Sequence, residues 1–218
     1  MKSGLLLFLV LTFVAKAASA HIVDEYLQAV QISFTPDAIR IEMCLTAGVD
    51  VADRVFAAID RDHNGQVSPT EQQAYAQRVL HDLTLEVDGH LAPLTLTSTD
   101  FPSRSAMKQG DAAIHLDFSA PVSLNSPGAH QLTFRNNHWP QIGVYQANAL
   151  VPTTDSIKIT GQQRDRSQHQ FELQFHVDSV APSAMPATVR KGAAPDAHSW
   201  TLWTRSLLVG VYLLLLST

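Results

Sequence analysis

The sequence predicts a mainly β protein, a β-sandwich into which one helix-loop-helix is inserted. Two observations predict this fold class. About eight short segments alternate apolar and polar residues and are separated by turn residues, which is typical of a sandwich. Between the second and third of these segments, residues 50–82 instead repeat apolar residues at helical spacing on both sides of a polar loop that contains glycine.

An export signal is expected at residues 1–20. Lys2 supplies a positive charge, residues 5–14 form an apolar run, and residues 18–20 read Ala-Ser-Ala, which fits a signal-peptidase site. The apolar run is too short to span a bilayer, which takes about 20 residues. We therefore expect a mature domain over residues 21–179 that begins at His21 and is exported to the periplasmic or cell-surface side of a membrane.

Residues 25–47 are expected to form two strands joined by a turn at residues 35–37. The apolar residues assigned to them are Tyr26, Ala29, Ile32, Phe34, Ile39, Ile41, Met43 and Leu45. Cys44 is the single cysteine and lies in this apolar run. We therefore expect a buried structural thiol and no internal disulfide.

The loop at residues 60–71 matches the pattern D-x-[DN]-x-[DN]-G-x5-E at every specified position. Ca²⁺ takes about six to eight oxygen ligands, so such a loop must wrap oxygen donors around one point. Gly65 lies where the chain must turn with a positive φ. The expected metal ligands are side-chain oxygens, one backbone carbonyl at the seventh position, and a hydroxyl that acts directly or through water: Asp60, Asp62, Asn64, Gln66, Ser68 and Glu71.

Helices are expected on both sides of the loop. Asp50 is expected to cap the first helix. Ser68 and Glu71 fit a capping box for the second helix, with Pro69 at its first position. The residues expected on the buried faces are Val51, Val55, Phe56 and Ile59 in the first helix and Tyr75, Val79 and Leu80 in the second.

The loop and its flanks, residues 50–82, resemble the EF-hand family. The resemblance implies Ca²⁺ as the bound cofactor. EF-hands usually pair through a short β contact at the eighth loop position, here Val67, and this sequence has one such loop. The resemblance therefore implies a structural or assembly-promoting ion rather than a cooperative sensor, with an affinity of the millimolar class found in extracellular modules.

The β pattern resumes after the helices. Residues 83–87 alternate up to Asp88-Gly89, which is a strong signal for a two-residue hairpin, and residues 91–96 are expected to return as the next strand. Turn residues separate the further expected strands, which are residues 113–119, 130–136, 143–151, 156–160 and 170–178.

The C-terminal part has a different composition. Residues 180–199 contain three prolines and little periodicity, which is typical of an extended linker. Residues 200–218 are apolar apart from Arg205 and, as a helix, would reach about 28 Å, close to the hydrocarbon thickness of about 30 Å. We expect a membrane anchor; a helix packed on the domain and a sorting tail are the alternatives.

A broader resemblance rests on residues 21–29, His-Ile-Val-Asp-Glu-Tyr-Leu-Gln-Ala, on the loop after two strands, and on residues 134–138, Phe-Arg-Asn-Asn-His. With the export signal, these features resemble bacterial exported proteins of unassigned role. They are similar, more distantly, to the extracytoplasmic domain of some nickel or cobalt transporter-like proteins. The multi-helix membrane part of those transporters is missing from this sequence, so the resemblance does not imply transport.

Charge and motifs exclude other classes. The chain has 15 basic and 20 acidic residues, and removal of Lys2 and Lys16 with the signal makes it more acidic. Nucleic-acid binding needs basic patches, so no nucleic-acid partner is expected. The sequence contains no glycine-rich phosphate loop, no G-x-S-x-G and no H-E-x-x-H, so we do not expect an enzyme.

Two alternatives to calcium binding stay open on the sequence alone. His21 at a free N-terminus can bind copper, or another transition metal such as nickel or cobalt, through its amine and imidazole. His115 and Asp117 lie two apart on an expected strand, project to one face, and can complete such a site. The residues that alternate with them would form the buried face: Ile114, Leu116 and Phe118. In the second alternative the loop is degenerate and the chain is an interaction domain that holds no metal.

Overall fold

A computed structural model of the chain describes residues 24–110 and 112–178. The expected signal at residues 1–20, His21, the linker at residues 180–199 and the apolar segment at residues 200–218 lie outside the described residues. Within the described ranges, no helix is long and apolar enough to cross a membrane.

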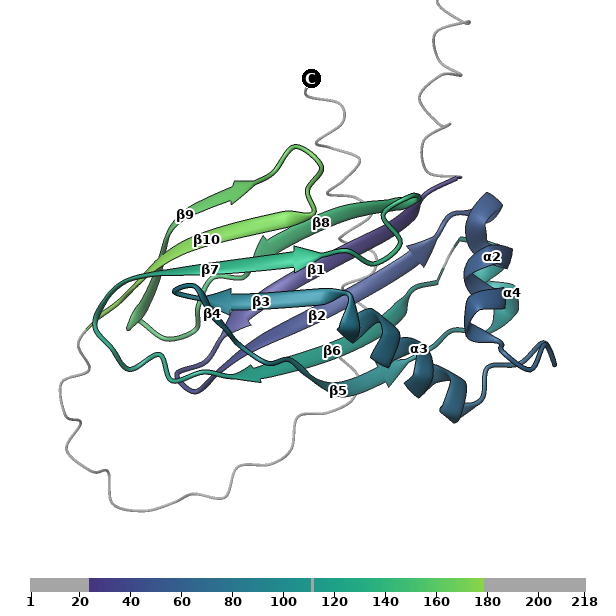
Figure 1. The fold of residues 1–218 in the computed structure, drawn as a ribbon, viewed down its shortest axis with the longest axis horizontal. Coiled ribbons are helices and arrows are strands. Elements are labelled where there is room, and N and C mark those ends of the chain that lie inside the picture. Colours follow the sequence, from purple (N-terminus) through teal and green to yellow (C-terminus); the bar gives the residue numbers. More distant parts are fainter. Residues whose placement is uncertain (1–23, 111, 179–218) are drawn as a thin grey trace, which may run out of the picture. The chain divides into compact units, whose positions relative to one another are not determined.

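The fold is mainly β, as the sequence predicts, and consists of two five-stranded sheets (Figure 1). Sheet A has the order β5 (Thr95–Asp100), β6 (Ile114–Pro121), β2 (Ala38–Ala47), β1 (Tyr26–Phe34) and β8 (Gly143–Ala149). Sheet B has the order β4 (His90–Leu91), β3 (Leu83–Val87), β7 (Gly128–Asn136), β10 (Gln170–Val177) and β9 (Ile157–Arg164). Neighbouring strands are antiparallel except β1 and β8, which are parallel.

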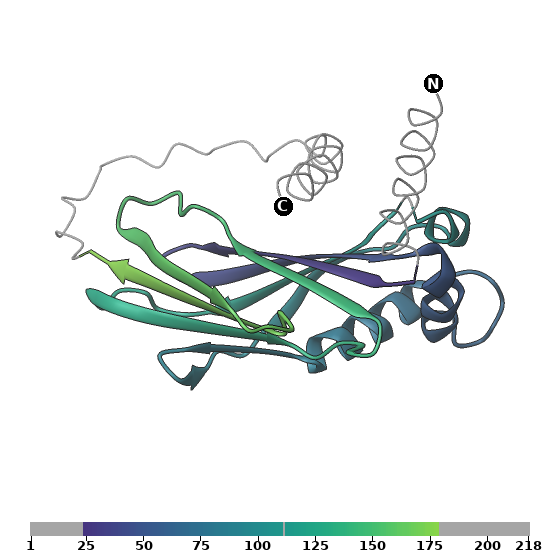
Figure 2. The same ribbon diagram turned by 90° about the horizontal axis from the view of Figure 1, so that it is seen from above.

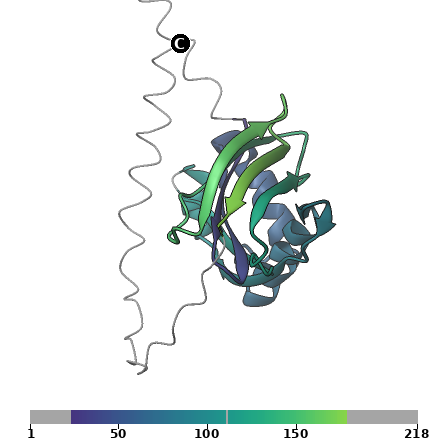
Figure 3. The same cartoon turned by 90° about the vertical axis from the view of Figure 1, so that its left-hand side faces the viewer.

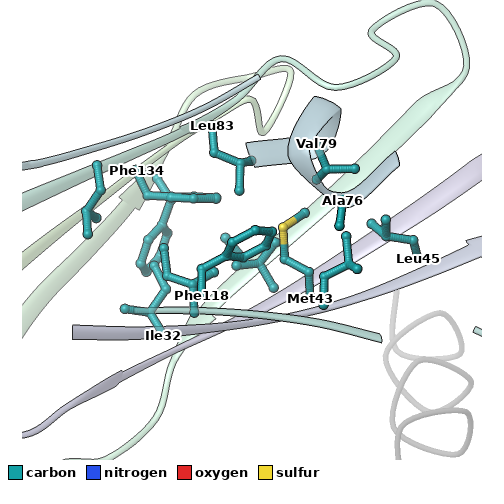
Figure 4. Close-up of a cluster of buried hydrophobic side chains, with 14 of the residues drawn as sticks. Ile32, Met43, Leu45, Ala76, Val79, Leu83, Phe118 and Phe134 are labelled. Carbon is teal, nitrogen blue, oxygen red and sulfur yellow. The ribbon is translucent and has the colours of Figure 1, made fainter. Parts of the chain in front are cut away.

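The core lies between the two sheets, which form two layers in Figures 2 and 3. In both β1 and β2, buried residues alternate with half-buried or exposed ones, as expected for strands with one face on a core. In Figure 4, side chains from sheet A, from sheet B and from helix α3 (Pro69–His81) meet in one cluster: Ile32, Met43, Leu45, Phe118, Leu83, Phe134, Ala76 and Val79. Full burial of one such aliphatic or aromatic side chain contributes about 1.5–3 kcal/mol. Helix α3 is therefore part of the core.

The helix-loop-helix lies between the second and third strands, as predicted. Its first helix is α2 (Val49–Ile59), which buries Val51, Ala52, Val55, Phe56 and Ile59. The expected cap at Asp50 is wrong: Gly48 is the N-cap, its carbonyl accepts from the amides of Val51 and Ala52, and Asp50 lies in the first turn. There its carboxylate is still favourable beside the positive end of the helix dipole.

A third helix, α4 (Arg104–Lys108), was not expected from the sequence. Ser103 caps it by accepting a hydrogen bond from the amide of Ala106, and Met107 is buried. The helix packs against α2, which places it beside the helix-loop-helix.

The hairpin at Asp88-Gly89 is confirmed, because β3 and β4 pair across it and both turn residues have positive φ, 51° and 76°. The expected return strand at residues 91–96 is not continuous. Strand β4 ends at Leu91, and β5 then pairs with β6 in the other sheet. The chain therefore crosses between the sheets directly after the hairpin.

Two assignments in the first strands are wrong. Gln28, not Ala29, lies on the core face of β1, and Gln28 is fully buried. Cys44 is half-buried and lies on the outer face of sheet A, because Met43 and Leu45 on either side of it point inward. The thiol is therefore not part of the core.

Candidate metal centre

The loop between α2 and α3 coils tightly at the positions where the sequence requires it. His63 and Gly65 both have positive φ, 57° and 82°. For glycine this conformation is unstrained, whereas for histidine it is uncommon. The backbone therefore turns twice within a few residues, which brings the carboxylates at the two ends of the loop together.

Asp60 and Asp62 accept hydrogen bonds from the amides of the loop itself. Asp60 is only 4% exposed; its Oδ1 accepts from the Asn64 amide at 3.1 Å and its Oδ2 from the Gly65 amide at 2.9 Å. Oδ1 of Asp62 accepts from the same Asn64 amide at 3.1 Å. These bonds hold both carboxylates toward the inside of the coil.

Glu71 closes the loop from the first turn of α3. Its Oε1 accepts from the Arg61 amide at 2.7 Å, and its Oε2 accepts from the Ser68 amide at 2.9 Å and the Ser68 hydroxyl at 2.8 Å. The predicted capping box is confirmed, with Pro69 at the start of the helix. The hydrogen bonds from Ser68, and after them those from Arg61 and Asp62, lower the pKa of Glu71 to about 2. Glu71 is therefore an anion throughout the neutral and mildly acidic range.

Three of the six predicted ligands converge. One carboxylate oxygen each from Asp60, Asp62 and Glu71 lie within 4.8 Å of one another, and no other group of histidine, cysteine, aspartate and glutamate side chains does so in the part of the chain that the structure describes. The donor set is made only of oxygens and carries three negative charges. It suits a hard divalent cation, which would neutralise the repulsion between the carboxylates.

The other three predicted ligands lie in the same coil. The Asn64 side chain donates to Oδ2 of Asp62 at 2.9 Å and accepts from the Gln66 amide at 2.8 Å. Gln66 is exposed, and Ser68 is half-buried at the N-cap of α3. A bound cation would take Asn64 through its side-chain oxygen and Gln66 through its carbonyl, and Ser68 lies next to Glu71.

The loop is braced against the rest of the fold. Asp53 of α2 pairs with Lys108 of α4 at 2.9 Å and with Arg104 at 3.6 Å. The Arg104 guanidinium also lies 4.8 Å from the centre of the Phe56 ring. Val67, at the eighth loop position, is half-buried and packs against the core. The position that would pair with a second EF-hand is therefore occupied by contacts within this chain.

A buried series of hydrogen bonds joins α3 to the sandwich, and the sequence did not predict it. The Tyr26 and Tyr75 hydroxyls are 2.9 Å apart, the Tyr75 hydroxyl lies 3.1 Å from Nε2 of His138, and Nδ1 of His138 lies 2.7 Å from Oδ2 of Asp82. A carboxylate only accepts, so Nδ1 donates to Asp82, and Nε2 of the neutral ring accepts from Tyr75, which in turn accepts from Tyr26. Each hydrogen that these four side chains share has an acceptor only when His138 is neutral.

Further polar side chains hold the backbone at His138 in place. The Gln28 amide donates to the carbonyl of His138 at 2.7 Å, and the Tyr145 hydroxyl donates to the same carbonyl at 2.6 Å. The Asn136 amide donates to Oε1 of Gln28 at 2.9 Å, and its Oδ1 accepts from the amide of His138 at 2.9 Å. These bonds explain why Gln28 and Asn136 tolerate burial.

We expect His138 and His130 to affect stability with opposite dependence on pH. Burial lowers the pKa of His138 despite its bond to Asp82, so its contribution is present above the unfolded pKa of about 6.5 and is lost as the pH falls below it. The hydrogen bond to Asp88, helped by the Ser126 carbonyl, raises the pKa of His130. Its contribution is present below about 6.5 and is lost as the pH rises through its folded pKa.

The measurement is urea unfolding between pH 5 and 8. Relative to the wild type, His138→Gln should lose less stability on acidification, whereas His130→Gln should lose less stability as the pH rises. Equal pH profiles for the wild type and both variants would contradict the assignment of these protonation states.

The structure describes two of the three residues that the sequence offered for a transition-metal site. His21 lies outside the described residues. His115 and Asp117 are half-buried on the outer face of sheet A, and the buried face of β6 is the expected one: Ile114, Leu116 and Phe118. Nδ1 of His115 lies 3.3 Å from Sγ of Cys44 on the neighbouring strand.

Comparisons with protein families, with curated proteins and with solved structures find no match to this chain. The fold and the loop therefore define its class by themselves. It is a mainly β, two-sheet protein that carries an acidic helix-loop-helix.

Proposed function

We propose that this chain is an exported calcium-binding protein that uses a single EF-hand loop. The observation that carries the proposal is the convergence of one oxygen each from Asp60, Asp62 and Glu71 within 4.8 Å. Positive φ at Gly65 supports it, because a calcium loop of this kind needs a sharp turn at its sixth position.

The donor chemistry favours calcium over other biological cations. All six proposed ligands offer oxygen, whereas copper, nickel and zinc are favoured by imidazole or thiolate ligands. Glu71 presents both of its oxygens on the loop side, which suits the flexible, often seven-coordinate shell of Ca²⁺. Mg²⁺ requires near-ideal octahedral geometry and prefers to keep several waters, so we expect it to bind more weakly.

We propose a structural or assembly-promoting role for the ion rather than a sensor role. Both helices are packed into the fold: α2 buries five residues, and α3 contributes Tyr75, Ala76 and Val79 to the interior. The chain of bonds through Tyr75 and His138 holds α3 on the sandwich. Opening of the two helices would expose these groups to water, so calcium is expected to lock the arrangement that the core already favours.

Export and tethering complete the proposal. Residues 1–20 are proposed to direct export, and residues 200–218 are proposed to anchor the domain at the periplasmic or cell-surface side of a membrane. Outside the cell, calcium sites with dissociation constants of about 10⁻⁴–10⁻³ M are usual in such modules. A site of that affinity is sufficient for a structural ion.

Asp62→Ala tests the proposal with little risk to the fold, because Asp62 is exposed. Calorimetric titration of the wild-type chain with Ca²⁺ should give one site per chain. Asp62→Ala should weaken binding at least about tenfold, or about 1.4 kcal/mol. The matched control is Asp155→Ala, which removes an exposed carboxylate from the turn before β9 and should bind as the wild type does. Wild-type affinity in Asp62→Ala would refute the site.

A further inference from the structure

A second group of side chains of the kinds that bind metals lies on the outer face of sheet A. Cys44 of β2 pairs with His115 of β6, and His115 pairs on its other side with Asp100 of β5. In the next row of the same face, Glu42 of β2 pairs with Asp117 of β6. Paired residues on adjacent antiparallel strands project to the same side of the sheet. One thiol, one imidazole and three carboxylates therefore share one face of three neighbouring strands.

The distance between the thiol sulfur and the imidazole nitrogen is already close to that between two ligands of one metal ion. Sγ of Cys44 lies 3.3 Å from Nδ1 of His115. A tetrahedral zinc ion has Zn–S bonds of about 2.3 Å and Zn–N bonds of about 2.0–2.1 Å, which places the sulfur and nitrogen about 3.5 Å apart. Little movement is needed for both atoms to bind the same cation.

The carboxylates beside this pair form no ion pair, and Arg40, two residues before Glu42 on β2, offsets the charge of Glu42 only in part. Glu42 and Asp117 lie directly opposite each other, and like charges in this arrangement destabilise a sheet. Throughout residues 24–110 and 112–178, the carboxylates of Glu42, Asp117 and Asp100 make no ion pair and accept no hydrogen bond. A divalent cation on this face would relieve the repulsion.

We propose that Cys44 and His115, with the carboxylate of Glu42 or Asp117 as third ligand, bind a transition metal ion of the Zn²⁺ class. Sulfur and nitrogen donors select borderline metals such as zinc and cobalt over Ca²⁺ and Mg²⁺. The third ligand arrives by rotation of a side chain, because the calcium loop is the one described group in which three donor atoms already lie within 4.8 Å. The site shares no residue with that loop, so this proposal can be tested independently of calcium binding.

Co²⁺ tests this site, because it replaces Zn²⁺ in tetrahedral sites and absorbs light when a thiolate binds it. Titration of the reduced, full-length chain should give a thiolate-to-cobalt charge-transfer band that saturates at one equivalent and disappears when Zn²⁺ is added. Cys44 is the single cysteine, so such a band can arise only from it. Cys44→Ser should abolish the band, and His115→Asn should weaken cobalt binding at least about tenfold. Glu42→Gln combined with Asp117→Asn should weaken it further than either change alone.

Two controls make the result specific. His90→Asn removes an exposed imidazole from strand β4 of the other sheet and should leave the band unchanged. Asp62→Ala should also leave it unchanged, because the calcium loop takes no part. The proposal is overturned if the wild type gives no thiolate band at millimolar Co²⁺, or if His115→Asn and His90→Asn bind cobalt equally well. Circular dichroism of each variant shows that loss of the band is not loss of the fold.

Discussion

Calcium should raise the unfolding temperature of the wild-type chain, and Glu71→Gln should remove most of that increase. A ligand that binds only the folded state stabilises it by about 1.4 kcal/mol at ten times its dissociation constant and by about 2.7 kcal/mol at a hundred times. For a chain of 150–250 residues, about 1 kcal/mol corresponds to about 2–4 °C. The expected increase in unfolding temperature is therefore about 3–10 °C. Thermal unfolding with and without calcium measures it.

Glu71→Gln keeps the helix cap while it takes one carboxylate oxygen from the proposed calcium ligands. Glu71 accepts from the Arg61 amide through Oε1 and from the Ser68 amide through Oε2. The single oxygen of glutamine can keep the bond from Ser68, as in other capping boxes, but its NH2 group cannot accept from Arg61. The variant should therefore lose some stability when calcium is absent, and the test is the size of the calcium-dependent increase in each protein rather than the unfolding temperature itself. Glu71→Ala removes the cap as well and should cost about 1 kcal/mol even without calcium. If Glu71→Gln gained as much from calcium as the wild type, Glu71 would not be a ligand.

His138→Ala should be among the most destabilising single changes in the domain. The ring is fully buried and lies between the Tyr75 hydroxyl and the Asp82 carboxylate. Its removal leaves a cavity, deprives Tyr75 of an acceptor, and leaves Asp82 without its imidazole donor. Broken buried networks of this kind cost about 2–4 kcal/mol, whereas His176→Ala, which removes an exposed histidine on β10, should stay within about 0.5 kcal/mol. Urea unfolding at pH 7.5 measures both.

A double-mutant cycle shows whether this cost comes from the hydrogen bond to α3. Tyr75→Phe removes the hydroxyl that His138 accepts from and keeps the ring. If the two groups act together, the combined variant should be more stable than the sum of the single changes predicts, with a coupling of about 0.5–3 kcal/mol. Strict additivity would mean that His138 stabilises the sandwich without fixing the helix.

The sequence was sufficient where the determining interactions are local. The tight coil at residues 60–71 was predictable because the spacing of Asp60, Asp62, Gly65 and Glu71 is local, and the capping box was predictable because Ser68 and Glu71 are three residues apart. Strand β2 was predictable because its apolar residues alternate without interruption. In each case a short stretch specifies its own conformation.

Long-range contacts explain what the sequence did not predict. Gln28 is buried because it bonds to the His138 carbonyl, 110 residues away, and to Asn136, 108 residues away. The contact between Cys44 and His115 spans 71 residues and depends on the pairing of β2 with β6. The motif at residues 134–138 was recognisable, but its role in a polar chain with Tyr75 becomes visible only when α3 is placed on the sandwich.

Short elements were missed for a different reason. Helix α4 has five residues, which is too few for a repeating apolar pattern, and its buried Met107 depends on contact with the rest of the fold. Strand β4 has two residues, so the return from the hairpin could not be distinguished from a longer strand. Which sheet β5 joins depends on the edge that β6 leaves open, and that edge is formed by residues later in the chain.

A crystal structure of the chain grown in excess calcium tests the central claim most directly. We expect one ion in the loop, with oxygens of Asp60, Asp62, Asn64 and Glu71 and the carbonyl of Gln66 at about 2.3–2.6 Å. Ser68 should lie in or next to the ligand shell, and the contact between Tyr75 and His138 should be retained. An ordered loop with no ion at millimolar calcium, or an ion held by other residues, would contradict the account.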